Sequence, residues 1–290
     1  MRKAAIAIIL LVAMASAFAW QHIGARRGAP EIPSMSASTS REAIGYAGNV
    51  ELTVVYDNNP YDPRLKAAWG FACYIETDTA KILFDTGGDP RTLLDNMEKL
   101  SISPQEIETI ILSHIHSDHV GGLFGILERN RDVDVYVPAS FPDDLKSRVR
   151  SFDSRLVEVE RPLKICEGVM TTGELGSVIK EQSLIVNSSK GLIVVTGCAH
   201  PGIAFIVEEA VELTDEEVYL VIGGFHLSGS SEEEIGSIID RFRSLNLTKV
   251  APCHCSGDLA RRMLKCSFQT GYIEAGVGTN LRIERQAARV

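Results

Sequence analysis

Short apolar runs alternate with amphipathic segments from about residue 50 to the end of the chain. Runs of β-branched and aromatic residues bounded by turn residues predict strands, and segments with apolar positions three and four apart predict helices. The expected strands are 50–56, 71–75, 81–84, 109–113, 133–137, 183–186, 192–196, 218–222 and one that ends near 250, and the expected helices are 90–100, 120–129, 142–152, 201–213, 231–245 and 256–265.

This order of elements predicts an α/β fold. Two β-rich halves with interspersed helices indicate sheets that pack face to face with helices outside. A chain of 290 residues with 45% hydrophobic residues can bury a large core, so one domain over residues 50–290 is expected.

The first 23 residues have a different composition. A basic pair at 2–3, an apolar run to Trp20 and small residues at 17 and 19 predict a cleaved secretory signal and an exported protein, periplasmic or extracellular. The alternative is an uncleaved membrane anchor, because the run is at the short limit for a span and a basic pair follows at 26–27. Residues 24–49, rich in Gly, Pro, Ser, Ala and Thr, predict a linker.

Charge narrows the range of partners. The net charge is −9, and acidic and basic residues are interspersed. The chain therefore has no basic stripe that could follow a phosphate backbone, so nucleic acid is excluded as the expected partner. We expect a small-molecule substrate, and a membrane contact only through an uncleaved N-terminal segment.

The segment 113–122 carries the strongest chemical signal. It reads Ser-His-Ile-His-Ser-Asp-His-Val-Gly-Gly, and its His-x-His-x-Asp-His pattern would arise by chance on the order of once in several thousand chains. Side chains two apart on an extended segment share a face, so His114 and His116 can reach one metal ion. Asp118 and His119 lie past the bend and can face a second ion, and imidazole with carboxylate suits a borderline cation such as zinc.

Three further histidines each follow an expected strand. They are His200, His226 and His254. Since strand ends that point to one rim of a sheet are where sites are assembled, their joint occurrence favours a shared site over three isolated core or surface histidines.

These motifs together resemble the metallo-β-lactamase superfamily. The resemblance covers residues 50–290 and includes a strand that ends in Asp85-Thr86-Gly87 before the histidine motif. It implies an αββα four-layer sandwich with metals at one edge of the two sheets. It further implies one or two Zn²⁺ ions, with Mn²⁺, Fe²⁺ or Mg²⁺ as alternatives, a first ion held by His114, His116 and His200, a second held by Asp118, His119 and His254, and Asp85 orienting the ligand loop.

One position departs from the family pattern. Many members have a bridging Asp at the end of the strand near 223–226, where this chain has Gly-Gly-Phe-His. A neutral imidazole has one free lone pair and does not bridge two ions as a carboxylate does. His226 is thus expected to bind one ion terminally, to face the substrate, or to lie on the rim without a ligand role, and occupancy by a single ion stays open.

The cysteines are scattered and show no zinc-knuckle or redox spacing. If the segment around His254 is extended, Cys253 and Cys255 point away from it, so packing is the expected role of these two and of Cys198. Pro201-Gly202 is expected to open a helix whose free N–H groups favour an anionic substrate.

Further strings resemble the dihydropterin-methyl ribofuranosylaminobenzene-phosphate synthase group of methanopterin biosynthesis and its uncharacterised relatives. They are 172–175, 181–184, 196–202, 223–227 and 252–257. The first hypothesis is a metal-dependent hydrolase that activates water against an ester, most simply a phosphoester, with Asp118 and His226 as the catalytic candidates. The alternatives are a metal-dependent transferase that joins a dihydropterin-methyl group to ribofuranosylaminobenzene phosphate with release of diphosphate, and a non-catalytic metal-binding domain.

Overall fold

The computed structural model describes residues 44–285. The expected signal or anchor (1–23) and most of the expected linker (24–43) lie outside these residues. Ile44 and Ala47, at the end of the expected linker, are buried. The Ala47 N–H donates to Asn187 O at 2.9 Å, and Ile44 O accepts from the Gly168 N–H at 2.9 Å. Residues 44–49 are therefore packed against the domain that follows them.

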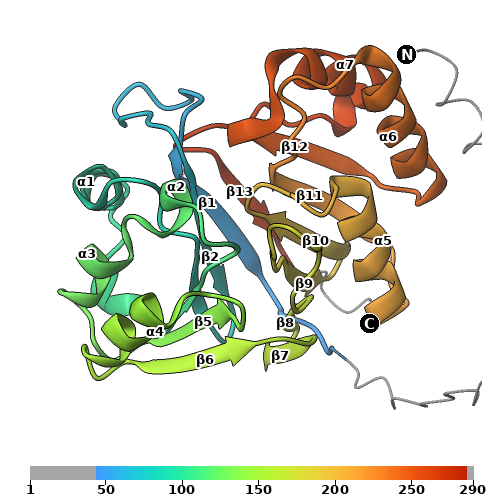
Figure 1. The fold of residues 1–290 in the computed structure, drawn as a ribbon. Coiled ribbons are helices and arrows are strands. Elements are labelled where there is room, and N and C mark those ends of the chain that lie inside the picture. Colours follow the sequence, from blue (N-terminus) through green and yellow to red (C-terminus); the bar gives the residue numbers. More distant parts are fainter. Residues whose placement is uncertain (1–43, 286–290) are drawn as a thin grey trace, which may run out of the picture. The chain divides into compact units, whose positions relative to one another are not determined.

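The first sheet has seven strands, and β1 lies between β13 and β2 near one edge of it (Figure 1). Strands β3 to β6 run parallel to one another, whereas β1, β2 and β13 pair antiparallel. In spatial order the strands are β13 (Asn280–Ile283), β1 (Val50–Asp57), β2 (Phe71–Thr77), β3 (Lys81–Phe84), β4 (Thr109–Ile111), β5 (Asp134–Pro138) and β6 (Arg155–Val159).

The second sheet has six strands. Strands β10, β11 and β12 are parallel, and β7 to β10 form an antiparallel run. In spatial order they are β12 (Lys249–Cys253), β11 (Val218–Gly224), β10 (Gly191–Thr196), β9 (Leu184–Ser188), β8 (Val169–Thr171) and β7 (Leu163–Cys166).

Helices cover the outer face of each sheet (Figure 1). The first sheet carries α1 (Pro90–Lys99), α2 (Ser117–Val120), α3 (Leu123–Leu127) and α4 (Asp143–Arg150), and the second carries α5 (Ile203–Thr214), α6 (Glu232–Ser244) and α7 (Asp258–Phe268). Single 3-10 turns lie at Pro104–Glu106, His254–Ser256 and Gln269–Gly271. This arrangement confirms the predicted αββα four-layer sandwich. Within residues 44–285, no helix combines the length and the apolar character that a membrane crossing requires.

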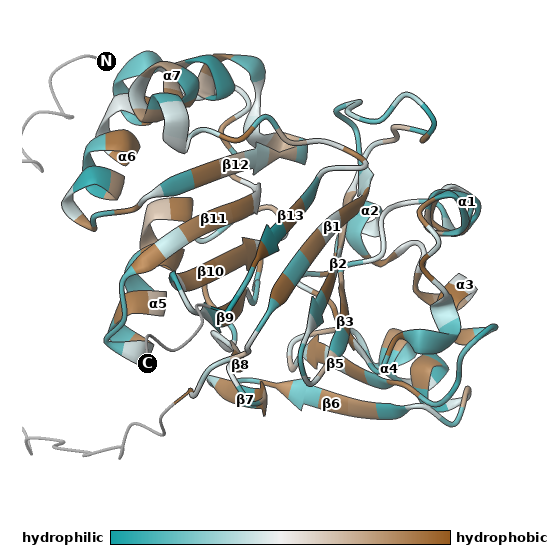
Figure 2. Ribbon diagram, turned by 180° about the vertical axis from the view of Figure 1, so that it is seen from behind, coloured by the Kyte–Doolittle hydropathy of each residue, from teal (hydrophilic) through white to brown (hydrophobic). Residues whose placement is uncertain are grey.

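The core has three apolar layers, one between the two sheets and one between each sheet and its helices. Side chains that alternate between the two faces of a strand contribute to two of these layers. In β10, Ile193 and Val195 face the other sheet, whereas Leu192 and Val194 face the helices α5 and α6. The period of two follows from the strand pleat, and burial on both faces explains why the strand reads as a continuous apolar run. In Figure 2, brown, the colour of hydrophobic residues, predominates on β1 in the first sheet and on β10 and β11 in the second.

The predicted helix 120–129 is wrong at its start. The chain instead forms two short helices, α2 and α3, that meet at Gly121-Gly122. A Cβ on Gly121 would lie 2.3 Å from Gly88 O, and one on Gly122 would lie 2.2 Å from Thr86 O. Glycine is required at both positions because the backbone between α2 and α3 passes close to the loop after β3.

The predicted helix 201–213 begins later than expected, at Ile203. Gly202 has a φ of 102°, outside the helical region, so Pro201 belongs to the turn that precedes the helix. The free N–H groups expected to favour an anion thus belong to the turn of α5 that begins at Ile203. Strands β6, β7, β8 and β13 were also not predicted, since they are three to five residues long and partly exposed, which leaves too little pattern to recognise.

Ser231 is expected to contribute to stability through a capping box on α6. Its side chain accepts from the Glu234 N–H, and the Glu234 carboxylate accepts from the Ser231 N–H at 2.7 Å. Ser231→Ala should lower the free energy of unfolding by about 1 kcal/mol in chemical denaturation. Ser237→Ala, at an exposed position of the same helix, is the control and should be neutral or slightly stabilising, because Ala has the higher helix propensity. Equal effects of the two substitutions would contradict the capping role.

Candidate metal centre

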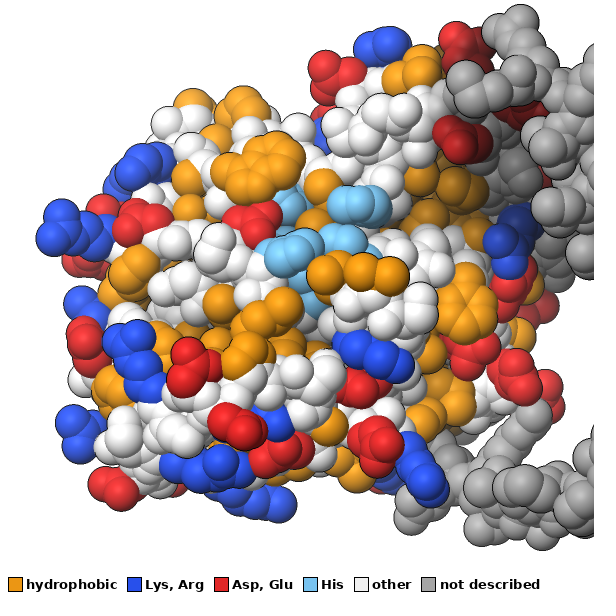
Figure 3. Space-filling model, in the orientation of Figure 1, with side chains coloured by type: hydrophobic (Ala, Val, Ile, Leu, Met, Phe, Trp, Pro, Cys, Tyr) orange, Lys and Arg blue, Asp and Glu red, His pale blue; other side chains and the backbone are white. Residues whose placement is uncertain are grey.

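The predicted site residues come from loops at one edge of the two sheets. Four follow β4 of the first sheet or lie in α2, and three follow neighbouring strands of the second sheet. Figure 3 shows the histidine side chains gathered at the centre of one face, with hydrophobic side chains above and below them. The first group comprises His114, His116, Asp118 and His119, and the second comprises His200 after β10, His226 after β11 and His254 after β12.

The candidate ligand atoms form two groups, and these are the two sets of ligands that the family resemblance implies. In the first group, those of His114, His116 and His200 lie within 4.8 Å of one another. In the second group, those of Asp118, His119 and His254 do so as well. The structure thus brings together all six side chains expected to bind metal.

Asp85 holds His119 in place directly and His114 through Ser113. This buried carboxylate accepts from the Ser113 N–H and the Ser113 hydroxyl, each at 2.7 Å, and from His119 Nδ1 at 2.7 Å. The Ser113 oxygen in turn lies 2.9 Å from His114 Nδ1. Because a carboxylate only accepts, and because the Ser113 hydrogen is used on Asp85, both imidazoles carry their proton on Nδ1 and a lone pair on Nε2.

Glu181 does the same for His200, and the sequence analysis assigned it no role. Its buried carboxylate accepts from three successive N–H groups, those of Cys198, Ala199 and His200, at 2.8 to 2.9 Å. It also accepts from His200 Nδ1 at 2.8 Å. Glu181 lies 19 residues before His200 and in no recognisable ligand motif, so only the fold reveals this contact.

His254 is oriented by the loop after β1. Its Nδ1 lies 2.7 Å from Asn58 Oδ1, and the Asn58 Nδ2 donates to His254 O at 3.3 Å, which fixes the direction of the amide. The His254 N–H donates to buried Asp57 at 2.9 Å. Trp69 stacks edge to face on the imidazole, with ring centroids 4.7 Å apart. The sequence offered no signal for Asn58 or Asp57 beyond their place after a strand.

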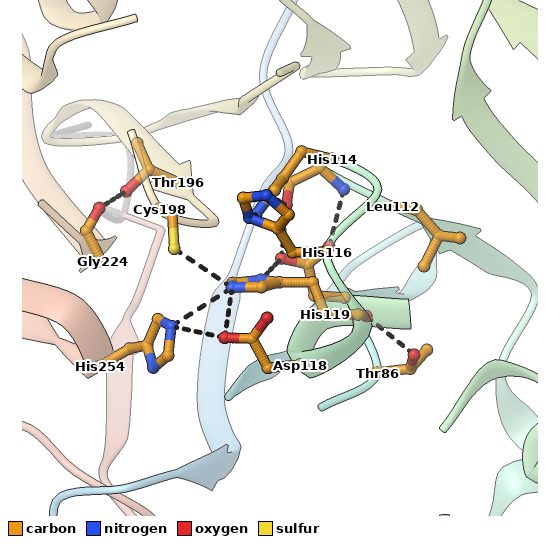
Figure 4. Close-up of polar contacts among 12 residues, drawn as sticks. Thr86, Leu112, His114, His116, Asp118, His119, Thr196, Cys198, Gly224 and His254 are labelled. Atoms are coloured by element: carbon orange, nitrogen blue, oxygen red, sulfur yellow. Dashed lines mark hydrogen bonds and ion pairs between the residues drawn. The ribbon is translucent and has the colours of Figure 1, made fainter. Parts of the chain in front are cut away.

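The Nε2 atoms of His119 and His254 and one oxygen of Asp118 lie close enough together to bind one cation. His119 Nε2 and His254 Nε2 lie 3.3 Å apart, and Asp118 Oδ2 lies 3.7 Å and 3.2 Å from them (Figure 4). With one proton per ring, on Nδ1, these three atoms are acceptors that face one another. A metal cation satisfies all three, and so does a second proton on His254, whose pKa burial lowers but the hydrogen bond with Asp118 raises above its ordinary value. Two imidazoles with one carboxylate are a donor set that zinc accepts.

Burial keeps two of these imidazoles neutral. It lowers the pKa of both His114 and His119 to about 3. Burial also acts to raise the pKa of Glu181, but the hydrogen bonds from His200 and from the backbone N–H groups lower it to about 2. Neutral imidazoles have the lone pair that a metal requires, and Glu181 remains an acceptor for the His200 ring.

Several residues of the site adopt left-handed backbone conformations. Asp85, Ala199, His226 and His254 have φ between 43° and 62°. Such conformations are unfavourable for residues other than glycine, and they persist where surrounding contacts over-determine them. Asp85, His226 and His254 thereby turn the chain just beyond a strand end and present their side chains to the cluster, whereas Ala199 presents its backbone N–H to Glu181.

The expectation that Cys255 points away from the site is wrong, and Cys198 and Cys255, although buried as expected, both lie beside the candidate ligands. Cys198 Sγ lies 3.3 Å from His119 Nε2 and 3.3 Å from Cys255 Sγ, so both thiols face the cluster. The physical reason is the 3-10 turn His254–Ser256, which replaces the extended segment and rotates Cys255 inward. Cys253 is packed in the core between the sheets as expected, and all six cysteines are free thiols.

His226 lies on the exposed rim of the cluster. Its ring centroid is 4.5 Å from that of His200, and its ligand atom lies within 4.8 Å of those of Cys198 and His200. A hydrogen bond with Cys255 raises the pKa of His226. The structure thus places it beside the group that contains His114 and His116, where it has access to solvent.

Comparisons with known proteins show which family the chain is similar to. The model of the metallo-beta-lactamase superfamily matches residues 70–212. The 7,8-dihydropterin-6-methyl-4-(beta-D-ribofuranosyl)-aminobenzene-5'-phosphate synthase of Methanocaldococcus jannaschii is 30% identical over 279 residues, which cover 79% of this chain and 95% of that protein. An uncharacterised protein of the same organism is 29% identical over 78% of this chain and 98% of its own length.

A solved structure has the same fold. A metal-dependent hydrolase of the beta-lactamase superfamily aligns with a TM-score of 0.70 and 27% identity over 81% of this chain and 99% of the other. The relatives thus include both a synthase and a hydrolase, so the reaction has to be argued from the site.

Glu181→Gln should weaken metal binding without removing a ligand. The amide nitrogen would donate where the carboxylate accepts, and this would move the His200 proton to Nε2 or break the contacts with the backbone N–H groups. We expect zinc affinity, measured by competition with a chromogenic chelator, to fall by about 10- to 100-fold. Glu128→Gln, at an exposed position, is the control. Unchanged affinity in Glu181→Gln would show that His200 does not depend on this contact.

Proposed function

The chain belongs to the metallo-β-lactamase superfamily, and we propose that it is a metal-dependent hydrolase that acts on a phosphoester. The observation that carries the proposal is the approach of His119 Nε2, His254 Nε2 and Asp118 Oδ2 to within 3.7 Å, with both Nδ1 atoms already bonded elsewhere. His114, His116 and His200 would hold one ion, and Asp118, His119 and His254 the other. A divalent ion held there would lower the pKa of water from about 16 to about 7 and would stabilise negative charge on the substrate oxygen.

The residues around the ligands complete the arrangement. Asp85, Glu181 and Asn58 fix the rings by their hydrogen bonds, so little reorganisation is required when substrate arrives. Asp118 has a side chain that is 21% exposed, and it accepts a proton from the attacking water or remains a ligand. His226, on the rim, donates a proton to the leaving oxygen.

Charge favours an anionic ester. Asp118 is the only carboxylate among the described candidate ligands, and the others are imidazoles and thiols. Bound cations would therefore leave positive charge toward the solvent side of the cluster, which attracts a phosphate group. The exposed indole of Trp69 beside His254 offers an apolar wall for the remainder of the substrate.

Transfer is the second candidate function. The synthase relative, 30% identical over 95% of its own length, favours it. In this reaction the ions would neutralise a leaving diphosphate, and an aromatic carbon would take the place of water as the nucleophile. The N-terminal segment, predicted to be a signal or an anchor, favours hydrolysis, because export separates the enzyme from pterin substrates made in the cytoplasm. A purely structural metal site is disfavoured by the exposure of His116 and His226, since structural zinc sites are closed.

Removal of metal is expected to abolish hydrolysis. The protein is screened against phosphodiesters, phosphomonoesters, thioesters and lactones, and metal content is analysed in the same sample. Dialysis against a chelator should eliminate turnover of the phosphoester, and zinc or manganese should restore it. Full activity in protein proven free of metal would refute the proposal.

Asp118→Asn should lower kcat/KM by at least roughly a hundredfold, because the amide is neither a strong metal ligand nor a proton acceptor. Asp240→Asn, on the exposed face of α6, should leave it unchanged. Similar activity in both variants would remove Asp118 from the reaction.

Diphosphate release separates the two candidate functions. Incubation with dihydropterin-methyl diphosphate and ribofuranosylaminobenzene phosphate should give no release if the enzyme is a hydrolase of other esters. Release that depends on both substrates would replace hydrolysis by transfer.

A further inference from the structure

The two halves of the metal cluster share one neighbour, the thiol of Cys198. Its Sγ lies within 4.8 Å of ligand atoms of His114 and His119, of His200 and His226, and of His254 and Cys255. Cys198 alone among the described candidate ligands is this close to two histidines of each half. The side chain is 4% exposed, and Figure 4 shows its sulfur directed at His119.

The cluster needs a negative ligand at this place. Two divalent ions close together repel each other, and neutral imidazoles do not offset that repulsion. Asp118 belongs to one half, and its Oδ2 contacts His119 and His254. A thiolate carries a negative charge and several lone pairs, so it can bind two cations at once, which an imidazole cannot do.

The end of β11 leaves room for the sulfur atoms. A Cβ on Gly224 would lie 2.4 Å from Gly197 O, 2.8 Å from Cys255 Sγ and 3.2 Å from Cys198 Cα. A side chain at position 224 would therefore collide with the backbone after β10 and with the Cys255 thiol. The close approach of the Cys198 backbone and of Cys255 to the end of β11 thus requires a glycine there.

We propose that the Cys198 thiolate bridges the two metal ions of this site, an inference that rests on the proposed metal-dependent function. Binding of the ions displaces the thiol proton to solvent and forms two metal–sulfur bonds in place of one S–H bond. The Cys255 thiol, which donates to Cys198 Sγ at 3.3 Å, positions the bridging sulfur. Because thiolate is a soft ligand, the site should bind zinc, iron or cobalt more tightly than manganese or magnesium, so that manganese restores activity only at higher concentration than zinc.

Cobalt spectroscopy tests the proposal without reference to turnover. Stripped protein, kept under a reductant so that the thiols remain free, is titrated with Co²⁺ while the sulfur-to-cobalt charge-transfer absorption and the bound metal per chain are measured. The native chain should show the band and two ions per chain. Cys198→Ala should lose the band and bind the second ion at least about tenfold more weakly, whereas Cys266→Ser, at an exposed position of α7, should match the native chain.

Cys255→Ala distinguishes the two thiols. It should keep the charge-transfer band, since Cys255 is a positioning residue. A band that is lost in Cys255→Ala and kept in Cys198→Ala overturns the proposal, as does one ion per native chain at saturation. Circular dichroism of each variant verifies that it is folded.

A measurement on the unmodified chain guards against variants that fail to fold. X-ray absorption at the zinc edge of the loaded native protein should require a sulfur neighbour at about 2.3 Å. A shell of nitrogen and oxygen alone overturns the thiolate bridge while leaving the metal-dependent function intact. Failure of the chain to bind any divalent ion would instead refute the proposed function itself.

Discussion

The site depends on hydrogen bonds at the Nδ1 atoms of its histidines. Each of His114, His119, His200 and His254 uses Nδ1 to contact an oxygen atom at 2.7 to 2.9 Å. This places the proton of each ring behind the cluster and the Nε2 lone pair toward it. The group that accepts the Nδ1 proton of a metal-binding histidine sets the orientation and the basicity of the ring. These contacts therefore largely determine whether the cluster can bind a cation.

The sandwich is what brings these partners together. Asp85 follows β3 in the first sheet, whereas Glu181 precedes β9 in the second. Gln182 joins the two layers, because its N–H donates to Ser113 O and its Nε2 donates to Leu112 O, both at 2.9 Å. The ligand loop after β4 is thus tied to the second sheet next to Glu181. Because the cluster has side chains from both sheets, any shift of one sheet relative to the other would distort it.

The features that could be predicted from the sequence are those set by residues close together in the chain. The His-x-His-x-Asp-His spacing and the apolar run before it identified the ligands from 114 to 119, and the long apolar strands identified the layers. Glu181 and Asn58 could not be predicted, because their contacts with His200 and His254 depend on how distant loops meet. The orientation of Cys255 depended on a left-handed φ at His254, which alternation along an extended strand does not reveal.

We propose that side chains from both sheets converge to hold divalent metal. Anomalous diffraction at the zinc absorption edge, from crystals grown with zinc, tests this directly. Anomalous peaks are expected between His119 Nε2, His254 Nε2 and Asp118, within bonding distance of each. Zinc found only at other places on the protein, with this cluster free of anomalous signal, would contradict it.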